Sequence, residues 1–338
     1  MKHVLVAVAW PYANGPLHLG HMAGCYLPAD IFARYHRLKG NQVLMVSGSD
    51  MHGTPIMVTA QQEGAEPEEV ALRYHEMNSR SIEQMGISFD LFTHTHTPEH
   101  QAVAQEIIER LDDAGYIEPR TTTAPYDPKA EQFLPDRYVE GTCPHCSSTG
   151  ARGDQCDSCG KTLDADELID PHPKLNPEVA LEFRETEHLF FRLSAFREKL
   201  LEWLAEGKEH WKSNVLNFTR NWLEEGLVDR AITRDLEWGI PVPREGYEDK
   251  RIYVWFEAVM GYFSASRHWA QLQGDDEAWR KWWDDPEAEH RYFMAKDNIP
   301  FHTIIWPAML LGCGLQLPHD VPANEYLLLD SAQFSKSR

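Results

Sequence analysis

A continuous run of apolar residues opens the chain. Val4–Ala9 carries no polar side chain, which is the pattern of a strand buried on both faces. A loop rich in proline and glycine follows at residues 10–16, and a helical pattern then covers residues 18–39 and ends at Gly40. Gln42–Val46 has the pattern of the next strand. Strand, helix and strand in this order predict a unit of a parallel sheet.

The rest of the chain alternates in the same way around one irregular stretch. Residues 117–190 are rich in Thr, Pro, Asp and Gly, have little periodicity and therefore predict an insertion. The other expected elements are helices from about Pro55 and Pro67, a helix over Glu99–Asp113, helices near 194–206 and 210–225, a strand over Arg251–Phe256 leading into a helix with Gly261 and Tyr262, a strand over Arg291–Ala295, a helix over Pro300–Leu311 and a last strand over Tyr326–Leu329.

These elements predict an α/β fold with a doubly wound parallel sheet, similar to a Rossmann nucleotide-binding sheet, split by a connective insertion that carries a metal. We expect the first half of the sheet domain at 1–116, the insertion at 117–190, the second half of the sheet domain at 191–325 and the start of a loop region at 326–338.

Composition narrows the class of protein. No apolar run approaches the roughly 20 residues of a membrane span, and the first run is too short for a signal peptide, so we expect a cytoplasmic protein without a membrane partner. The formal net charge is −21, and the acidic residues are scattered along the chain. This pattern favours a salt-adapted acidic surface, with an ordinary acidic enzyme as the alternative. A nucleic-acid partner would need a local basic face.

Four of the six cysteines lie within seventeen residues, as two Cys-x-x-Cys pairs: Cys143, Cys146, Cys156 and Cys159. Stable disulfides are rare in the cytosol, so paired Cys-x-x-Cys indicates a metal. Four thiolates fill the tetrahedral coordination of Zn²⁺ and leave no open position, which predicts one structural zinc. A pair of redox-active dithiols is the alternative.

Two histidines stand at the beginning of the first predicted helix. His18, Gly20 and His21 come directly after the buried strand and its Pro/Gly loop, where free backbone N–H groups and the helix dipole favour anions. The two imidazoles share one face of the first turn and can donate to a triphosphate. Gly20 lacks the Cβ that would collide with a sugar or base lying there. Two surface or structural histidines are the alternative.

A short Ser/Lys loop lies at the other end of the chain. Lys336, within Gln333–Arg338, follows the last predicted strand. A lysine on a flexible loop can move onto a pyrophosphate as charge develops there, and thereby stabilise the transition state. A solvated turn without a function is the alternative.

These motifs together resemble those of class I aminoacyl-tRNA synthetases, and specifically of the methionyl-tRNA synthetase family. The resemblance covers nearly the whole chain, in the family's order. It rests on Pro11–His21, Asp50–Pro55, Phe133–Cys143, Tyr253–Phe256, Lys296–Ala308 and Phe334–Arg338.

The resemblance implies that the chain activates L-methionine with ATP and Mg²⁺ and transfers it to tRNA(Met). It implies catalytic roles for His18, His21 and Lys336. ATP would be bound by these residues together with Tyr12, Asn14, Gly20, Asp297 and Arg234. Methionine would be bound by Trp10, Tyr12, Asp50, Trp255, Ala258, Tyr262, Ile299 and His302, with Asp50 on the ammonium group. Aromatic side chains suit the thioether sulfur, although each of them has core packing as its alternative.

The chain departs from the family's commoner pattern at several positions. Glu257–Tyr262 reads Glu-Ala-Val-Met-Gly-Tyr in place of Asp-Ala-Pro-Ile-Gly-Tyr, Trp10 stands where leucine is common, and Gln333 replaces a lysine. A second cysteine knuckle has no ligands here, which favours one zinc. The sequence stops before the family's helical anticodon-binding domain, so the chain is either a fragment or naturally short, and we expect weak tRNA binding.

We therefore expect a monomeric methionine–tRNA ligase of haloarchaeal origin. A zinc-containing module that binds RNA or a partner protein without catalysis is one alternative. A nucleotidyl transferase of the same fold that activates another acid is a second.

Overall fold

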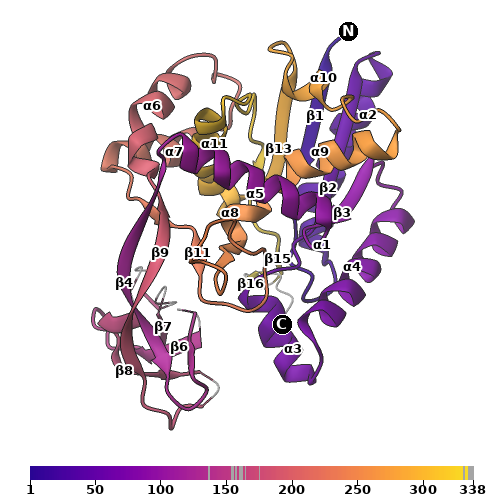
Figure 1. The fold of residues 1–338 in the computed structure, drawn as a ribbon. Helices are drawn as coiled ribbons and strands as arrows, with labels where there is room; N and C mark the ends of the chain where they lie inside the picture. Colours follow the sequence, from indigo (N-terminus) through magenta and orange to yellow (C-terminus); the bar gives the residue numbers. More distant parts are fainter. Residues whose placement is uncertain are drawn as a thin grey trace. The chain divides into compact units, whose positions relative to one another are not determined.

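A parallel five-stranded sheet forms the centre of the larger of two structural units (Figure 1). Its strand order is β14 (Ala323–Asn324), β13 (Glu289–Ala295), β1 (His3–Val8), β2 (Gln42–Ser49) and β3 (Leu91–His94). In this computed structural model, residues 1–135, 138–153, 156, 158–159, 163, 165–174, 176–329 and 332–333 are described. The predicted doubly wound parallel sheet is confirmed.

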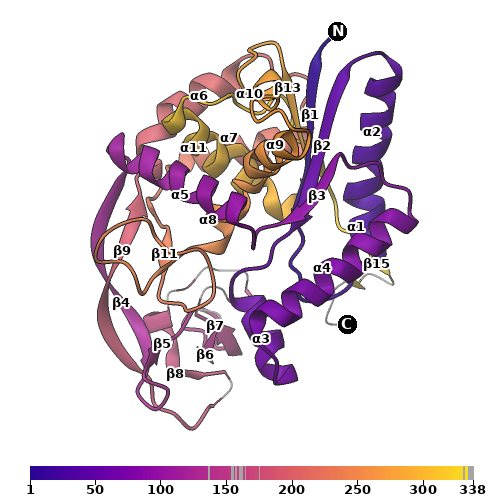
Figure 2. The same cartoon turned by 45° about the vertical axis from the view of Figure 1, so that its right-hand side comes forward.

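Helices cover both faces of the sheet because its central strand is apolar on both sides. Val4, Val6 and Val8 of β1 pack with α2 (Leu27–Leu38) and α4 (Pro67–Gln84) on one face. On the other face lie α9 (Gly261–Leu272), next to β2 and β3, and α10 (Arg280–Trp283), next to β1. Figure 2 shows α2 and α9 on opposite sides of the strands.

The remaining helices of this unit agree closely with the predicted ranges, except at 254–258, part of which was predicted as a strand, and at 296–298, where no helix was predicted. They are α1 (Leu19–His21), the π-helical η1 (Met22–Tyr26), α3 (Thr54–Glu63), α5 (Pro98–Asp113), η4 (Leu193–Phe196), α6 (Arg197–Ala205), α7 (Ser213–Glu225), α8 (Val254–Ala258), η5 (Lys296–Asn298), the π-helical η6 (Phe301–Ile305) and α11 (Trp306–Cys313). None of the helices in the described residues combines the length and the apolar character that a bilayer crossing requires.

The smaller unit comprises residues 118–191 and 231–253. Its sheets contain β4 (Ile117–Asp127) with β5 (Gln132–Phe133), β9 (Glu182–Phe191) and β10 (Arg230–Ala231), then β6 (Val139–Thr142) with β7 (Thr149–Arg152) and β8 (Ile169–Pro173), and finally β11 (Thr233–Arg234) with β12 (Arg251–Ile252). A short helix, η3 (Ala165–Glu167), belongs to the same unit. Two buried cysteines, Cys143 and Cys156, contribute to its small core.

Three sequence-based expectations differ from the structure. Residues 231–253, predicted to lie in the second half of the sheet domain, belong to the smaller unit. The predicted strand over Arg251–Phe256 ends at Ile252, because the apolar residues after it form α8. The predicted last strand over Tyr326–Leu329 is only β15 (Leu328–Leu329), which pairs antiparallel with β16 (Ala332–Gln333), while β14 forms the edge of the parallel sheet.

The stability of the fold is expected to depend on pH through buried histidines. Burial lowers the pKa of His75, His94, His290 and His302 to about 4. Between the ordinary value of about 6.5 and pH 4, the unfolded chain therefore binds more protons than the folded chain, and the free energy of unfolding falls as the pH falls. Melting temperatures measured from pH 7.5 down to pH 5 should decrease.

The variant His290→Gln removes one of these titrating groups and should reduce the dependence of the melting temperature on pH. A melting temperature that stays constant over this range in the unmodified chain would contradict the expectation.

Candidate active site

Several of the predicted site residues of the larger unit follow the carboxyl ends of three neighbouring parallel strands. β1 lies between β2 and β13. The chain passes from β1 to β2 and β3 on one side of it and later adds β13 and β14 on the other side, so the strand order reverses at β1. Ligands of open α/β sheets bind at such a switch point, outside the carboxyl ends of the strands. Tyr12 and His18 follow β1, Asp50 follows β2, and Asp297 follows β13.

Backbone hydrogen bonds fix the loop after β1 beside the loop after β2. Asp50 N–H donates to Pro11 O at 2.9 Å, and Ala13 N–H donates to Asp50 O at 2.8 Å. The buried Asn78 of α4 accepts the Leu17 N–H at 3.1 Å and holds the end of the same loop. The aspartate predicted to bind an ammonium group is therefore part of the scaffold that positions Tyr12.

His18 and His21 cap the first turn of α1 reciprocally. Gly20 N–H donates to His18 Nδ1 at 3.1 Å, and His18 N–H donates to His21 Nδ1 at 3.2 Å. The ring centroids lie 3.8 Å apart. Because Nδ1 accepts in both rings, each imidazole carries its hydrogen on Nε2. The two side chains therefore have the same tautomer, with their Nε2–H groups as donors.

Gly20 is required by the protein itself. A Cβ at this position would lie 2.8 Å from Cε1 of the capping His18 ring. The sequence-based reason, space for a nucleotide, stays a prediction.

Asp297 lies directly after β13, in η5. Although its side chain is exposed, desolvation by the surrounding protein raises the pKa of Asp297 above the ordinary range of an aspartate. Its charge also contributes to the raised pKa of Cys25, about 12, for which burial is the largest cause. Asp297 is therefore close to η1, the segment that continues the histidine turn.

Residues predicted to bind methionine are joined by hydrogen bonds in the same unit. The Trp255 indole N–H donates to the Tyr12 hydroxyl, and the Trp255 ring lies edge-on to Phe301 at 5.0 Å. The Tyr262 hydroxyl lies 2.7 Å from His302 Nε2, and His302 Nδ1 lies 2.9 Å from the Asn298 carbonyl. Since Nδ1 must donate to that carbonyl, Nε2 accepts from Tyr262.

The protein thus satisfies both ring nitrogens of His302, as expected of a core histidine. Tyr262, Ile299 and His302 are buried, whereas Trp10, Tyr12, Trp255 and Ala258 are partly exposed. The buried residues can support a binding surface, and the partly exposed ones can line it.

The Trp10 ring packs against two glycines on different elements. A Cβ added to Gly48 of β2 would lie 2.3 Å from the ring, and one added to Gly261 of α9 would lie 2.8 Å from it. Tyr262 and His100 lie at centroid distances of 6.4 Å and 6.2 Å from Trp10. The tryptophan that replaces the family's commoner leucine therefore depends on two positions without side chains.

Sequence reasoning missed a buried carboxylate beside this group. Glu257 of α8 is completely buried between His52 and His100. Burial alone would raise the pKa of Glu257, but the two imidazoles lower it below its ordinary value. The positions lie 205 and 157 residues apart in the chain, so no local pattern identifies the cluster.

The four predicted metal ligands meet in the smaller unit. The sulfur atoms of Cys143, Cys146, Cys156 and Cys159 all lie within 4.8 Å of one another. Cys143 and Cys159 are separated by 3.9 Å, and Cys146 and Cys156 by 3.7 Å. A tetrahedron with bonds of about 2.3 Å has sulfur–sulfur edges of about 3.8 Å, so this arrangement fits a metal held by four thiolates.

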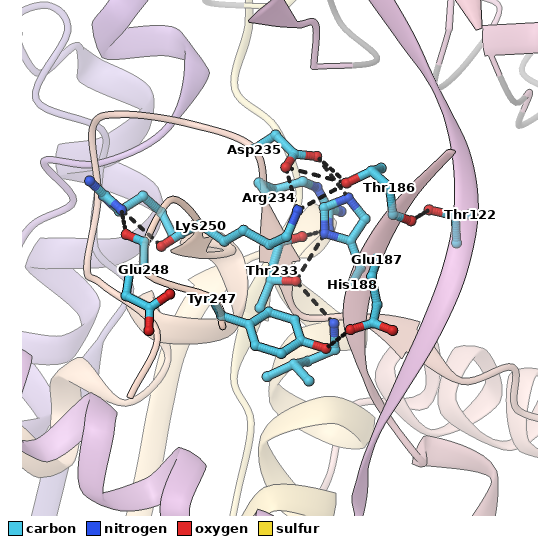
Figure 3. Close-up of polar contacts among 12 residues, drawn as sticks. Thr122, Thr186, Glu187, His188, Thr233, Arg234, Asp235, Tyr247, Glu248 and Lys250 are labelled. Atoms are coloured by element: carbon cyan, nitrogen blue, oxygen red, sulfur yellow. Dashed lines mark hydrogen bonds and ion pairs between the residues drawn. The ribbon is translucent and has the colours of Figure 1, made fainter. Parts of the chain in front are cut away.

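Arg234 also belongs to the smaller unit, on β11. Its guanidinium lies 4.1 Å above the Tyr253 ring, and Nη1 donates to the carbonyls of Ala231 and Thr233. The neighbouring Asp235 binds Lys250 at 2.5 Å and His188 at 3.1 Å (Figure 3).

This cluster fixes the segment that carries Arg234. Desolvation alone would raise the pKa of Asp235, but His188 and Lys250 lower it to about 2. The Thr233 hydroxyl accepts the Leu189 N–H at 3.1 Å, which attaches β11 to β9. Of these residues, only Arg234 was predicted to have a role, and the buried ion pair beside it was not predicted.

Lys336 lies outside the described residues, so its predicted role stays a prediction.

Comparison with known proteins identifies relatives of the whole chain. The family profile described as "tRNA synthetases class I (M)" matches residues 4–338. Methionine–tRNA ligase of Dehalococcoides mccartyi (strain CBDB1) is 59% identical over 338 residues, which are 100% of this chain and 61% of that protein. The enzyme of the same name from Thermomicrobium roseum is 58% identical, over 98% of this chain and 57% of that protein. The one from Thermoplasma acidophilum is 54% identical, over 99% of this chain and 61% of that protein.

The fold is also similar to that of a solved structure, Mycobacterium tuberculosis methionyl-tRNA synthetase in complex with methionyl-adenylate. The TM-score is 0.77 at 27% identity, over 100% of this chain and 60% of that one. The chain thus spans about three fifths of the length of the relatives it matches. These relatives are bacterial and archaeal, and they give no support to the predicted haloarchaeal origin.

The contact between Trp10 and Gly261 can be tested with a pair of variants. Gly261→Ala places a methyl group into the Trp10 ring and should destabilise the protein by about 1–3 kcal/mol. Trp10→Leu in the same chain should restore most of that loss, because leucine leaves room for the methyl group. Urea unfolding of both single variants and the double variant gives the coupling free energy. Additive effects would contradict the contact.

Proposed function

We propose that this chain, which belongs to the class I tRNA synthetases of the methionyl (M) type, activates L-methionine with ATP. One observation carries the proposal. His18 and Asp297, predicted to bind ATP, follow β1 and β13, and Asp50, predicted to bind methionine, follows the adjacent β2 at the same edge of the sheet. An adenylate that joins the two substrates requires this proximity.

The proposed reaction needs no protein nucleophile. The carboxylate of methionine attacks the α-phosphorus of ATP, an oxygen–phosphorus bond forms, and pyrophosphate leaves. Positioning and charge stabilisation are sufficient for such a step. The Nε2–H groups of His18 and His21 support a role as donors to phosphate oxygens, and the Asp50 carboxylate suits the ammonium group of methionine.

Transfer of the methionyl group to tRNA(Met), with Mg²⁺ bound alongside ATP, completes the proposed activity. The support is the printed name of the relatives, methionine–tRNA ligase, and the methionyl-adenylate complex of the similar structure. A cytoplasmic location and a monomeric state are part of the same proposal. Salt adaptation of the acidic surface rests on the net charge of −21 alone.

The metal of the smaller unit is proposed to be one structural Zn²⁺. Four thiolates at tetrahedral separations favour zinc and leave no position for a substrate. The ion would be held by Cys143, Cys146, Cys156 and Cys159. Its role is to stabilise a unit whose own apolar core is small.

Loss of one ligand should remove the metal and stability together. Cys143→Ser should contain little zinc, where the unmodified chain contains one ion per chain by elemental analysis, and should unfold at a lower temperature. Cys313→Ser is the matched control, since Cys313 is a buried cysteine of α11 outside the cluster. Full zinc content in the Cys143 variant would refute the assignment.

Exchange of labelled pyrophosphate into ATP tests the proposed activity. The unmodified chain, assayed at low and at multimolar KCl, should exchange pyrophosphate when methionine is present and not with other amino acids. Greater exchange in high salt would support the salt-adapted surface. Stimulation by a different acid would favour another nucleotidyl transferase, and no exchange at any salt concentration would favour a binding module.

Two substitutions of His21 separate donation to the substrate from helix capping. Asparagine retains an acceptor near the position of Nδ1 but lacks the Nε2–H donor, whereas glutamine has a donor near Nε2 but lacks the cap. We expect His21→Asn to keep the melting temperature and to lower exchange by 10²-fold or more. Normal exchange in this variant would remove the assigned role.

Lys336→Ala should also slow exchange.

A further inference from the structure

The Glu257 carboxylate joins its own helix and the loop after β2, both of which carry residues predicted to bind methionine, to the helix α5. It lies on α8 between Trp255 and Ala258, and its oxygens contact His52 Nδ1 at 2.7 Å and His100 Nε2 at 2.5 Å. His52 stands two residues after Asp50, in the loop after β2. His100 stands in the first turn of α5, which packs against α9.

His100 connects the Glu257 carboxylate to α9. The Ser264 hydroxyl lies 3.1 Å from the Gly261 carbonyl and 2.8 Å from His100 Nδ1, so it links the histidine to the first turn of α9. His100 Nε2 faces the Glu257 carboxylate and donates to it. The buried carboxylate of Glu257 therefore has a hydrogen-bond donor on the α5 side.

His52 completes the cluster as the second donor to the carboxylate. Its Nδ1–H donates to Glu257, and its Nε2 lies 3.2 Å from His96 Nδ1, which can supply the second hydrogen bond. The His52 N–H also points to Asp50 Oδ1 at 3.3 Å. The carboxylate on α8 thereby fixes the backbone that orients the Asp50 side chain.

The packing around the cluster transmits this constraint to the aromatic residues. A Cβ at Gly53 would lie 2.7 Å from Val254, so the loop after β2 contacts α8 directly. Gly261, whose carbonyl accepts from Ser264, supports the Trp10 ring. Trp255 and Ala258 are partly exposed, whereas Val254 and Glu257 are buried on the other side of the same short helix.

We propose that Glu257, held between His52 and His100, is a positioning residue for methionine. It sets the distance between Asp50, which would bind the ammonium group, and Trp255 and Ala258, which would contact the side chain. This inference rests on the proposed function, because it assumes that methionine binds among these residues. It assigns Glu257 no contact with the substrate.

The charge and the reach of Glu257 can be separated by substitution. Glutamine has the same length, accepts from His52 through its oxygen and donates to a neutral His100 through its nitrogen. Aspartate keeps the charge but is one methylene shorter and cannot contact both imidazoles unless the segments move. We expect Glu257→Gln to keep the KM for methionine within about threefold of the unmodified chain, and Glu257→Asp and Glu257→Ala to raise it tenfold or more.

The KM for ATP should change less than twofold in all three variants, because Glu257 has no contact with the histidine turn among the described interactions. The matched control is Glu289→Ala. Glu289 is a buried carboxylate with two cationic partners, Lys2 at 2.5 Å and Arg291 at 2.9 Å, but it lies at the amino end of β13, away from the site. It should lose stability and keep both KM values.

A second pair of variants keeps the test valid if a Glu257 variant does not fold. His52→Asn retains a donor near Nδ1 and should keep the KM for methionine, whereas His52→Ala should raise it. Methionine-dependent exchange with an unchanged KM for methionine in Glu257→Asp and His52→Ala would overturn the inference alone. An unmodified chain without methionine-dependent exchange would overturn the proposed function, and the inference with it.

Discussion

The site depends on the two backbone hydrogen bonds that join Pro11 and Ala13 to Asp50. Both loops leave a parallel sheet at its carboxyl edge, where the ladder ends and the backbone groups need new partners. Pairing them with each other extends the contact between β1 and β2 by a single bridge between Tyr12 and Asp50. An aromatic side chain and a carboxylate are thereby brought together by the backbone alone.

Beyond that bridge, histidine is the residue that connects separate segments. His302 joins Tyr262 to the Asn298 carbonyl, His100 joins Glu257 to Ser264, and His52 joins Glu257 to His96. An imidazole can donate at one nitrogen and accept at the other, or donate at both, so it adapts to carbonyl, hydroxyl and carboxylate partners. Burial of so many imidazoles makes the fold sensitive to acid, and in return it fixes the aromatic groups in position.

The extent of successful prediction follows the separation of residues along the chain. The strand Val4–Ala9, the histidine turn and the cysteine pairs are local patterns, and the structure contains each of them. The predicted strand over Arg251–Phe256 was wrong because a short apolar run fits a helix and a strand equally well. The Glu257 cluster and the packing of Trp10 on Gly261 join distant positions, and no periodicity encodes such pairs.

The tautomer of the histidine turn constrains the origin of positive charge in the proposed reaction. His18 and His21 accept backbone N–H groups at Nδ1, so protonation of either ring would break the cap that starts α1. They are therefore suited to act as neutral donors, which orient phosphate oxygens without offsetting their charge. A chain with a net charge of −21 must then supply compensation for a leaving pyrophosphate from a few cationic groups. Lys336, Arg234 and a magnesium ion are the proposed sources.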